Sequence, residues 1–123
     1  MADENNPLGY KSENFAVRII KLCDMLYTKN NGVLARQLLR SGTSIGANVA
    51  EGQAGQSVPD MLSKFKIAEK EARESKYWLK LLLRSNGISK ETYVGFVCEL
   101  DEIISMLVAS CCTLSAKKGN LSS

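Results

Sequence analysis

Hydrophobic residues recur along the chain with the spacing of an α-helix, and no segment shows the two-residue alternation of a strand. The first helical segment runs from about residue 11 or 12 to Thr28. Its apolar face consists of Phe15, Ile19, Leu22, Cys23 and Leu26. Asn30, Asn31 and Gly32 follow as a turn signal, so we expect the first helix to end there.

Three more helical segments follow the first. We expect the second over Val33 to Glu51, the third from about Pro59 to Ser85, and the fourth from Ser89 to about residue 115. Pro59 suits the first turn of a helix, and Ser89 suits an N-cap. Each segment has one apolar stripe, as an amphipathic helix with one buried face requires.

Two glycines lie on or beside the apolar stripe of the second segment. Gly42 and Gly46 each cost a helix about 1 kcal/mol relative to alanine. We expect a compensating close approach of a neighbouring helix, which a side chain at either position would block.

Short connections between amphipathic helices favour antiparallel neighbours. The sequence therefore predicts an all-α fold, an antiparallel up-down-up-down four-helix bundle over residues 11–115. Residues 1–10 are expected to be disordered or irregular. Residues 116–123, which are mostly polar, are expected to form a flexible tail.

Composition narrows the possible chemistry. The chain has 123 residues, which corresponds to one domain, and it has no histidine. Catalytic Ser-His-Asp and Cys-His pairs and histidine-containing zinc sites are therefore excluded. The four cysteines (Cys23, Cys98, Cys111 and Cys112) have no CxxC spacing, and we expect small buried reduced thiols. The start of the chain lacks signal-peptide features and no apolar run is long enough to cross a membrane, which predicts a soluble cytoplasmic protein.

Polar residues also recur where a bundle would place apolar ones. On the second segment they form the polar row, which consists of Arg36, Arg40, Ser44, Asn48 and Glu51. On the third segment Glu71 falls on the inner face and Glu74 flanks it, and a buried carboxylate needs a partner. One interpretation is a solvated face with one ion pair. The other is a seam buried by another helix or subunit, in which Arg40 or Arg36 holds Glu71 or Glu74.

A catalytic role for Glu71 and Glu74 is the weakest hypothesis. Paired carboxylates can perform acid–base chemistry. The sequence offers no metal-ligand cluster, no nucleophile–base pair and no phosphate-binding loop after a strand. We therefore expect no catalytic residue, no metal, no cofactor and no small-molecule substrate.

The third segment also carries a run of cations on one side. The basic stripe lies within an arc of about 80° at 100° per residue. It consists of Lys66, Lys70, Arg73, Lys80 and Arg84, with Tyr77 among them. It is either the solvated face of an amphipathic helix or a track for nucleic-acid phosphates, with Tyr77 stacking on a base. The net charge of the whole chain is only +3, because the fourth segment is acidic.

Two separated motifs resemble one protein family. Residues 37–51 (QLLRSGTSIGANVAE) are similar to its second-helix signature, and residues 70–79 (KEARESKYWL) to its third. The family comprises small bacterial proteins described as S23 ribosomal proteins or 23S rRNA intervening-sequence proteins. The resemblance covers roughly residues 10–114.

This resemblance implies a four-helix bundle that typically assembles as a ring-shaped homopentamer. Relatives include the accessory protein of diversity-generating retroelements, which binds a reverse transcriptase and nucleic acid. The matching positions look like fold- and assembly-defining residues; they are Ser44, Asn48, Glu51, Glu71, Glu74, Tyr77 and Trp78. The expected partners are further copies of the chain, a protein such as a reverse transcriptase, and RNA or DNA, but no membrane.

Two functional hypotheses remain after these steps. The first is a non-enzymatic homo-oligomeric interaction module of a protein or ribonucleoprotein complex. The alternative is direct RNA or DNA binding through the basic stripe.

Overall fold

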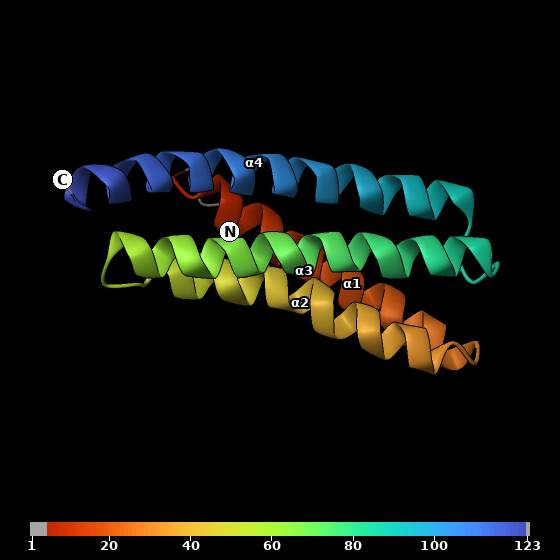
Figure 1. Cartoon of the computed structure of the whole chain (residues 1–123). Helices are drawn as coiled ribbons and strands as arrows, with labels where there is room; N and C mark the ends of the chain where they lie inside the picture. Colours follow the sequence, from red (N-terminus) through yellow and green to blue (C-terminus); the bar gives the residue numbers. More distant parts are fainter. Residues whose placement is uncertain (1–4, 123) are drawn as a thin grey trace.

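Four antiparallel helices make up the fold (Figure 1). The structure is a computed structural model that describes residues 5–122 of the chain. The helices are α1 (Pro7–Thr28), α2 (Gly32–Gln53), α3 (Val58–Arg84) and α4 (Lys90–Ser122). Successive helices run in opposite directions, and the described part contains no strand. The expected all-α four-helix bundle is confirmed.

Polar caps start three of the helices. The side chain of Asn6 accepts a hydrogen bond from the Gly9 backbone N–H at 3.0 Å, and Pro7 occupies the first turn of α1. Ser57 begins α3 and Ser89 begins α4 in the same way. Residues 7–10 are therefore helical, which corrects the expected irregular segment over residues 1–10. Residues 1–4 of that segment lie outside the described residues.

Asparagines end α1 and α3, and α4 is longer than expected. Asn30 and Asn86 both adopt a φ of 63°, a left-handed conformation that asparagine tolerates and that ends α1 and α3. In contrast, α4 continues to Ser122, so residues 116–122 of the expected flexible tail are helical. No proline interrupts this stretch, and its polar side chains through Asn120 are exposed. Residue 123 lies outside the described part.

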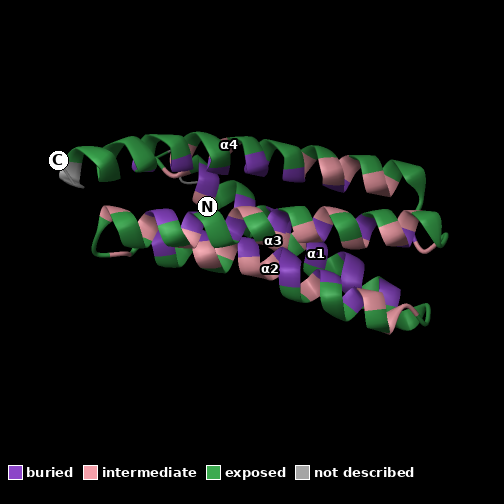
Figure 2. Cartoon of the chain, viewed as in Figure 1, coloured by how far each residue is buried: buried purple, intermediate pink, exposed green. Residues whose placement is uncertain are grey.

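The core runs along the inside of the bundle, and each helix contacts only its two neighbours in the described chain. Figure 2 shows the buried residues on the inner faces of all four helices. The largest fully buried side chains include Phe15, Ile19, Leu38, Ile45, Leu79, Leu82, Leu100 and Leu107. The predicted apolar stripes thus form the core, as burial of apolar surface requires.

The glycines of α2 permit the close approach expected from the sequence. A Cβ added at Gly42 would lie 2.9 Å from Cγ2 of Ile19 on α1. A Cβ at Gly46 would lie 3.4 Å from the backbone oxygen of Ser12, also on α1. The α1–α2 contact is therefore tightest where α2 lacks side chains.

The contact between α1 and α4 closes the bundle and is less extensive than the other three. Phe15 and Phe96 pack edge to face with ring centroids 6.0 Å apart. The Arg18 guanidinium lies 4.5 Å from the Phe96 ring centroid and also pairs with Glu99. This small contact therefore combines aromatic packing, a cation–π interaction and an ion pair.

The cysteines divide into two pairs. Cys23 and Cys111 are buried, but Cys98 and Cys112 are exposed on α4, which corrects the expectation that all four thiols are buried. All four are free thiols. Among the described helices, none is long and apolar enough to cross a membrane.

Candidate functional site

Arg40 on α2 bridges the two carboxylates of α3. One guanidinium nitrogen lies 3.3 Å from Oε2 of Glu71, and the other contacts Oε2 of Glu74. Glu71 and Glu74 are three residues apart, so one helix face presents both to the planar guanidinium. The predicted pairing is confirmed for Arg40.

This bridge lies at the surface rather than inside the bundle. The Glu71 side chain is 15% exposed, whereas the Arg40 side chain is 50% exposed. The hydrogen bond that Arg40 donates to Glu74, together with the charges of both glutamates, raises the pKa of Arg40 above its ordinary value. Because the carboxylates are satisfied within the chain, they require no second subunit.

Three further members of the polar row have partners within the chain. Ser44 and Asn48 donate to backbone oxygens one turn earlier on α2, those of Arg40 and Ser44 respectively. Glu51 forms an ion pair with Lys64 of α3 at 3.3 Å. Arg36 is exposed and forms no ion pair with a described residue. The row is therefore not buried by another helix of this chain.

Beneath the bridge, the α2–α3 contact holds two buried hydroxyls. The hydroxyl oxygens of Ser41 and Ser75 lie 2.8 Å apart, and Ser75 also donates to the backbone oxygen of Glu71. Trp78 buries its indole N–H without an acceptor among the described residues. An unpaired buried donor of this kind costs about 1–3 kcal/mol.

The basic stripe of α3 faces outward. All six members are exposed: Lys66, Lys70, Arg73, Tyr77, Lys80 and Arg84. The Tyr77 side chain is among the most exposed large apolar groups, at 54%, and its ring packs edge to face on Trp78 with centroids 5.3 Å apart. The stripe is therefore available to a partner of the single chain.

Carboxylates next to the stripe are already paired. Glu69 binds Arg73 at 3.0 Å, and Asp101 of α4 binds Lys76 at 2.7 Å. Four cations of the stripe form no ion pair within residues 5–122; they are Lys66, Lys70, Lys80 and Arg84. The outer face of α3 therefore keeps a net positive charge.

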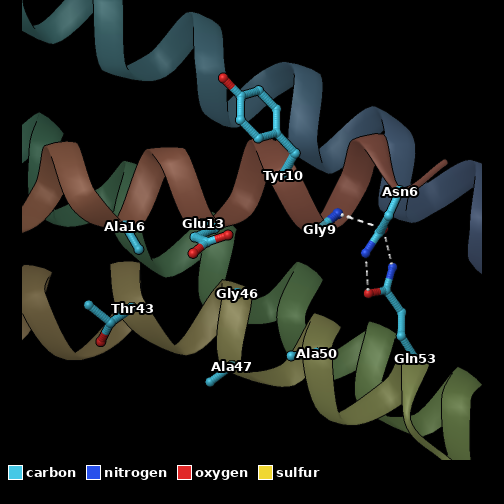
Figure 3. Close-up of a pocket in the computed structure, with 10 residues that line it drawn as sticks. All are labelled: Asn6, Gly9, Tyr10, Glu13, Ala16, Thr43, Gly46, Ala47, Ala50 and Gln53. Atoms are coloured by element: carbon cyan, nitrogen blue, oxygen red, sulfur yellow. Dashed lines mark hydrogen bonds between the residues drawn. The ribbon is translucent and has the colours of Figure 1, made fainter. Parts of the chain in front are cut away.

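The structure also contains a groove between α1 and α2 that the sequence did not predict (Figure 3). Its volume is about 470 Å³, and small residues of both helices, such as Ala16, Gly46 and Ala50, form its walls. Asn6 and Gln53 close one end by two reciprocal amide hydrogen bonds of 2.8 and 2.6 Å. Glu13 is the one charged group among its lining residues. The small residues of α2 indicated a close contact between helices, but their spacing does not indicate a groove.

Exposed apolar side chains are most frequent on α1, and one of them, Tyr10, also lines this groove. Of the ten exposed large hydrophobic residues, five belong to α1; they are Tyr10, Val17, Ile20, Met25 and Tyr27. The same helix supplies Glu13 to the groove. Three of these apolar residues, Val17, Ile20 and Tyr27, lie within an arc of about 80° of the helix. Apolar side chains gathered in this way are typical of protein–protein contacts.

Within the described residues, no group of three Cys, Asp or Glu side chains is placed to hold a metal ion. Glu71 and Glu74, the carboxylates considered for acid–base chemistry, both bind Arg40. The exposed side chains of α1, the groove and the basic stripe remain accessible to a partner.

The comparisons with known proteins agree with this geometry. The chain matches a solved structure from Bacteroides thetaiotaomicron, a protein of unknown function from the S23 ribosomal protein family. The two share 42% identity with a TM-score of 0.83, and the match covers 85% of this chain and 97% of the other. No curated protein matches. The profile of the 23S rRNA-intervening sequence proteins matches residues 4–109. The chain therefore belongs to the 23S rRNA-intervening sequence protein family.

Proposed function

We propose that this protein is a non-enzymatic interaction module that works as a homo-oligomer and docks a protein or ribonucleoprotein partner. The family resemblance implies a pentameric ring. A cytoplasmic location suits such a module, because exposed thiols such as Cys98 and Cys112 stay reduced there.

The observation that carries this proposal is the apolar surface of α1. Exposure of Val17, Ile20 and Tyr27 on one helix costs hydration free energy that a contact between copies would recover. The Arg40 bridge does not support the proposal, because its charges are satisfied within one chain.

Sedimentation velocity of matched variants tests the proposal. Ile20→Ser on α1 removes an apolar side chain that is 43% exposed, and Val108→Ser on α4 removes one that is 39% exposed. We expect Ile20→Ser to shift the protein toward smaller species and Val108→Ser to leave the distribution unchanged. Equal behaviour of both variants, or a wild-type protein that stays monomeric at micromolar concentration, would contradict the proposal.

The basic stripe supports a second candidate, direct binding of RNA or DNA. Its cations track along α3, and the Tyr77 ring offers a stacking surface supported by Trp78. Binding of this type falls steeply with salt, because bound phosphates release counterions.

Titration of a single-stranded RNA at about 50 mM salt tests this candidate. We expect Lys70→Glu combined with Arg73→Glu to weaken binding and reduce its dependence on salt. The control is Lys90→Glu combined with Lys117→Glu, which changes the net charge equally through exposed cations of α4. Absent binding, or equal loss in both double variants, would rule out a specific role of the stripe.

A further inference from the structure

The outer faces of α1 and α3 point in different directions. Within the described chain, α1 contacts α2 and α4, α3 contacts the same two helices, and α1 does not contact α3. The two helices are therefore diagonal partners in the bundle. Any surface on one of them is separated from the other by the full width of the core.

One edge of α1 combines acidic and apolar residues. Within an arc of about 80° at 100° per residue, this α1 edge carries five exposed side chains. They are Glu13, Val17, Ile20, Asp24 and Tyr27. Neither Glu13 nor Asp24 forms an ion pair with any residue in 5–122. The nearest cation on the outer face of the same helix is Lys21, which lies outside this arc.

The basic stripe has the opposite character and a similar size. It also spans about 80° of its helix, and its cations surround one exposed aromatic ring, Tyr77. Lys70 and Lys80 lie about 15 Å apart along α3, and Glu13 and Asp24 lie about 16 Å apart along α1. Two carboxylates without ion pairs on one face thus match two cations without ion pairs on the other in spacing and sign.

We propose that the α1 edge of one copy docks on the basic stripe of the next copy. This inference rests on the self-association proposed above and names the two surfaces that form it. Glu13 and Asp24 pair with Lys70 and Lys80 of the neighbour. Val17 and Ile20 cover apolar area around Tyr77.

The placement of the surfaces determines the symmetry of the contact. Because the two faces differ and lie on diagonal helices, the contact is head-to-tail and leaves each copy with one surface still open. Such a contact forms a closed ring or an open chain, never a two-fold dimer of the same patch. It also covers the basic stripe, so nucleic acid and the neighbouring copy compete for the same cations.

Charge-reversal variants of the full chain test this pairing by light scattering at several salt concentrations. The α1 variant is Glu13→Lys with Asp24→Lys, and the α3 variant is Lys70→Glu with Lys80→Glu. We expect each alone to raise the dissociation constant about tenfold or more. The quadruple variant restores both complementarity and the original net charge, and we expect it to associate again. Lys90→Glu with Lys117→Glu serves as the control for the α3 variant, because both double variants change the net charge by the same amount.

The outcomes separate this inference from the proposed function. Loss of association in each double variant, recovery in the quadruple variant and no change in the control would support the inference. Wild-type association that neither double variant weakens would overturn the inference while leaving self-association intact. A monomeric wild-type protein would overturn both. An α3 variant that keeps its mass but no longer binds single-stranded RNA would assign the stripe to nucleic acid instead.

Discussion

The hydroxyl oxygens of Ser41 and Ser75 lie 2.8 Å apart at the buried contact between α2 and α3. Each hydroxyl also reaches a backbone oxygen on its own helix, that of Leu38 or Glu71. Small polar residues at this position let the two helices approach beneath the Arg40 bridge. Because Ser75 donates to the backbone oxygen of Glu71, the buried pair is in direct contact with a residue of the bridge.

Removal of either hydroxyl should destabilise the protein modestly. We expect Ser41→Ala and Ser75→Ala each to lower the free energy of unfolding by about 1 kcal/mol. Because either single variant already loses the hydrogen bond between the two hydroxyls, the double variant should lose less than the sum of the two. Urea unfolding of all four proteins gives the coupling. Fully additive losses would show that the two hydroxyls do not interact.

Gly42 and Gly95 should respond in opposite ways to alanine. A Cβ at Gly42 would lie 2.9 Å from Ile19, whereas a Cβ at Gly95 in α4 meets no atom within 4 Å. Alanine favours a helix over glycine by about 1 kcal/mol, so Gly95→Ala should stabilise the protein. Gly42→Ala should lower the melting temperature, since overpacking costs about 1–3 kcal/mol. A stabilising Gly42→Ala would contradict the close approach of α1 and α2.

Arg40 and Arg36 provide a matched pair on α2. We expect Arg40→Ala to lower the free energy of unfolding by about 1 kcal/mol, because Glu71 and Glu74 lose their shared cation. Arg36→Ala should change it by less than about 0.5 kcal/mol. Chemical unfolding at low and high salt checks both values, and the difference should shrink as salt screens the charges. Equal effects would show that the bridge contributes nothing.

Burial of Cys23 should make stability sensitive to alkaline pH. Desolvation, with a smaller contribution from Asp24, raises the pKa of the Cys23 thiol from 9.0 to about 11. Between these values the unfolded chain loses the proton first, so stability is full below pH 9 and falls as the pH rises toward 11. The loss should reach about 2 kcal/mol near the upper end.

Variants isolate this contribution from other alkaline titrations. Unfolding free energies at pH 8 and pH 10.5 should differ less in Cys23→Ala than in the wild-type protein. Cys98→Ala, which removes an exposed thiol, should keep the wild-type difference. An identical pH dependence in all three proteins would show that Cys23 does not cause it.

The four helices and their buried faces could be predicted from apolar spacing alone, because each stripe had one period and clear turn residues. The start of α1 and the end of α4 were harder to predict. Asn6 followed by Pro7 is a cap signal, but it precedes the main apolar stripe. The last turns of α4 have no apolar stripe that would indicate a helix, and the polar residues of 116–120 gave no reason to expect one.

Of the candidate sites, some could be predicted from the sequence and others could not. The Arg40 bridge was predictable, because a carboxylate near an inner face requires a nearby cation. The groove beside Gly46 was not, since it depends on how closely two helices pack, and residue spacing does not give that distance. The exposure of Cys98 and Cys112 was missed because cysteine usually lies inside proteins.

The molar mass in solution shows whether the protein works as an assembly of identical chains. Multi-angle light scattering on the wild-type protein at micromolar concentration gives that mass without assumptions about shape. We expect a discrete multiple of the 13.5 kDa chain that falls as salt rises. A mass of 13.5 kDa at every salt and protein concentration would contradict it.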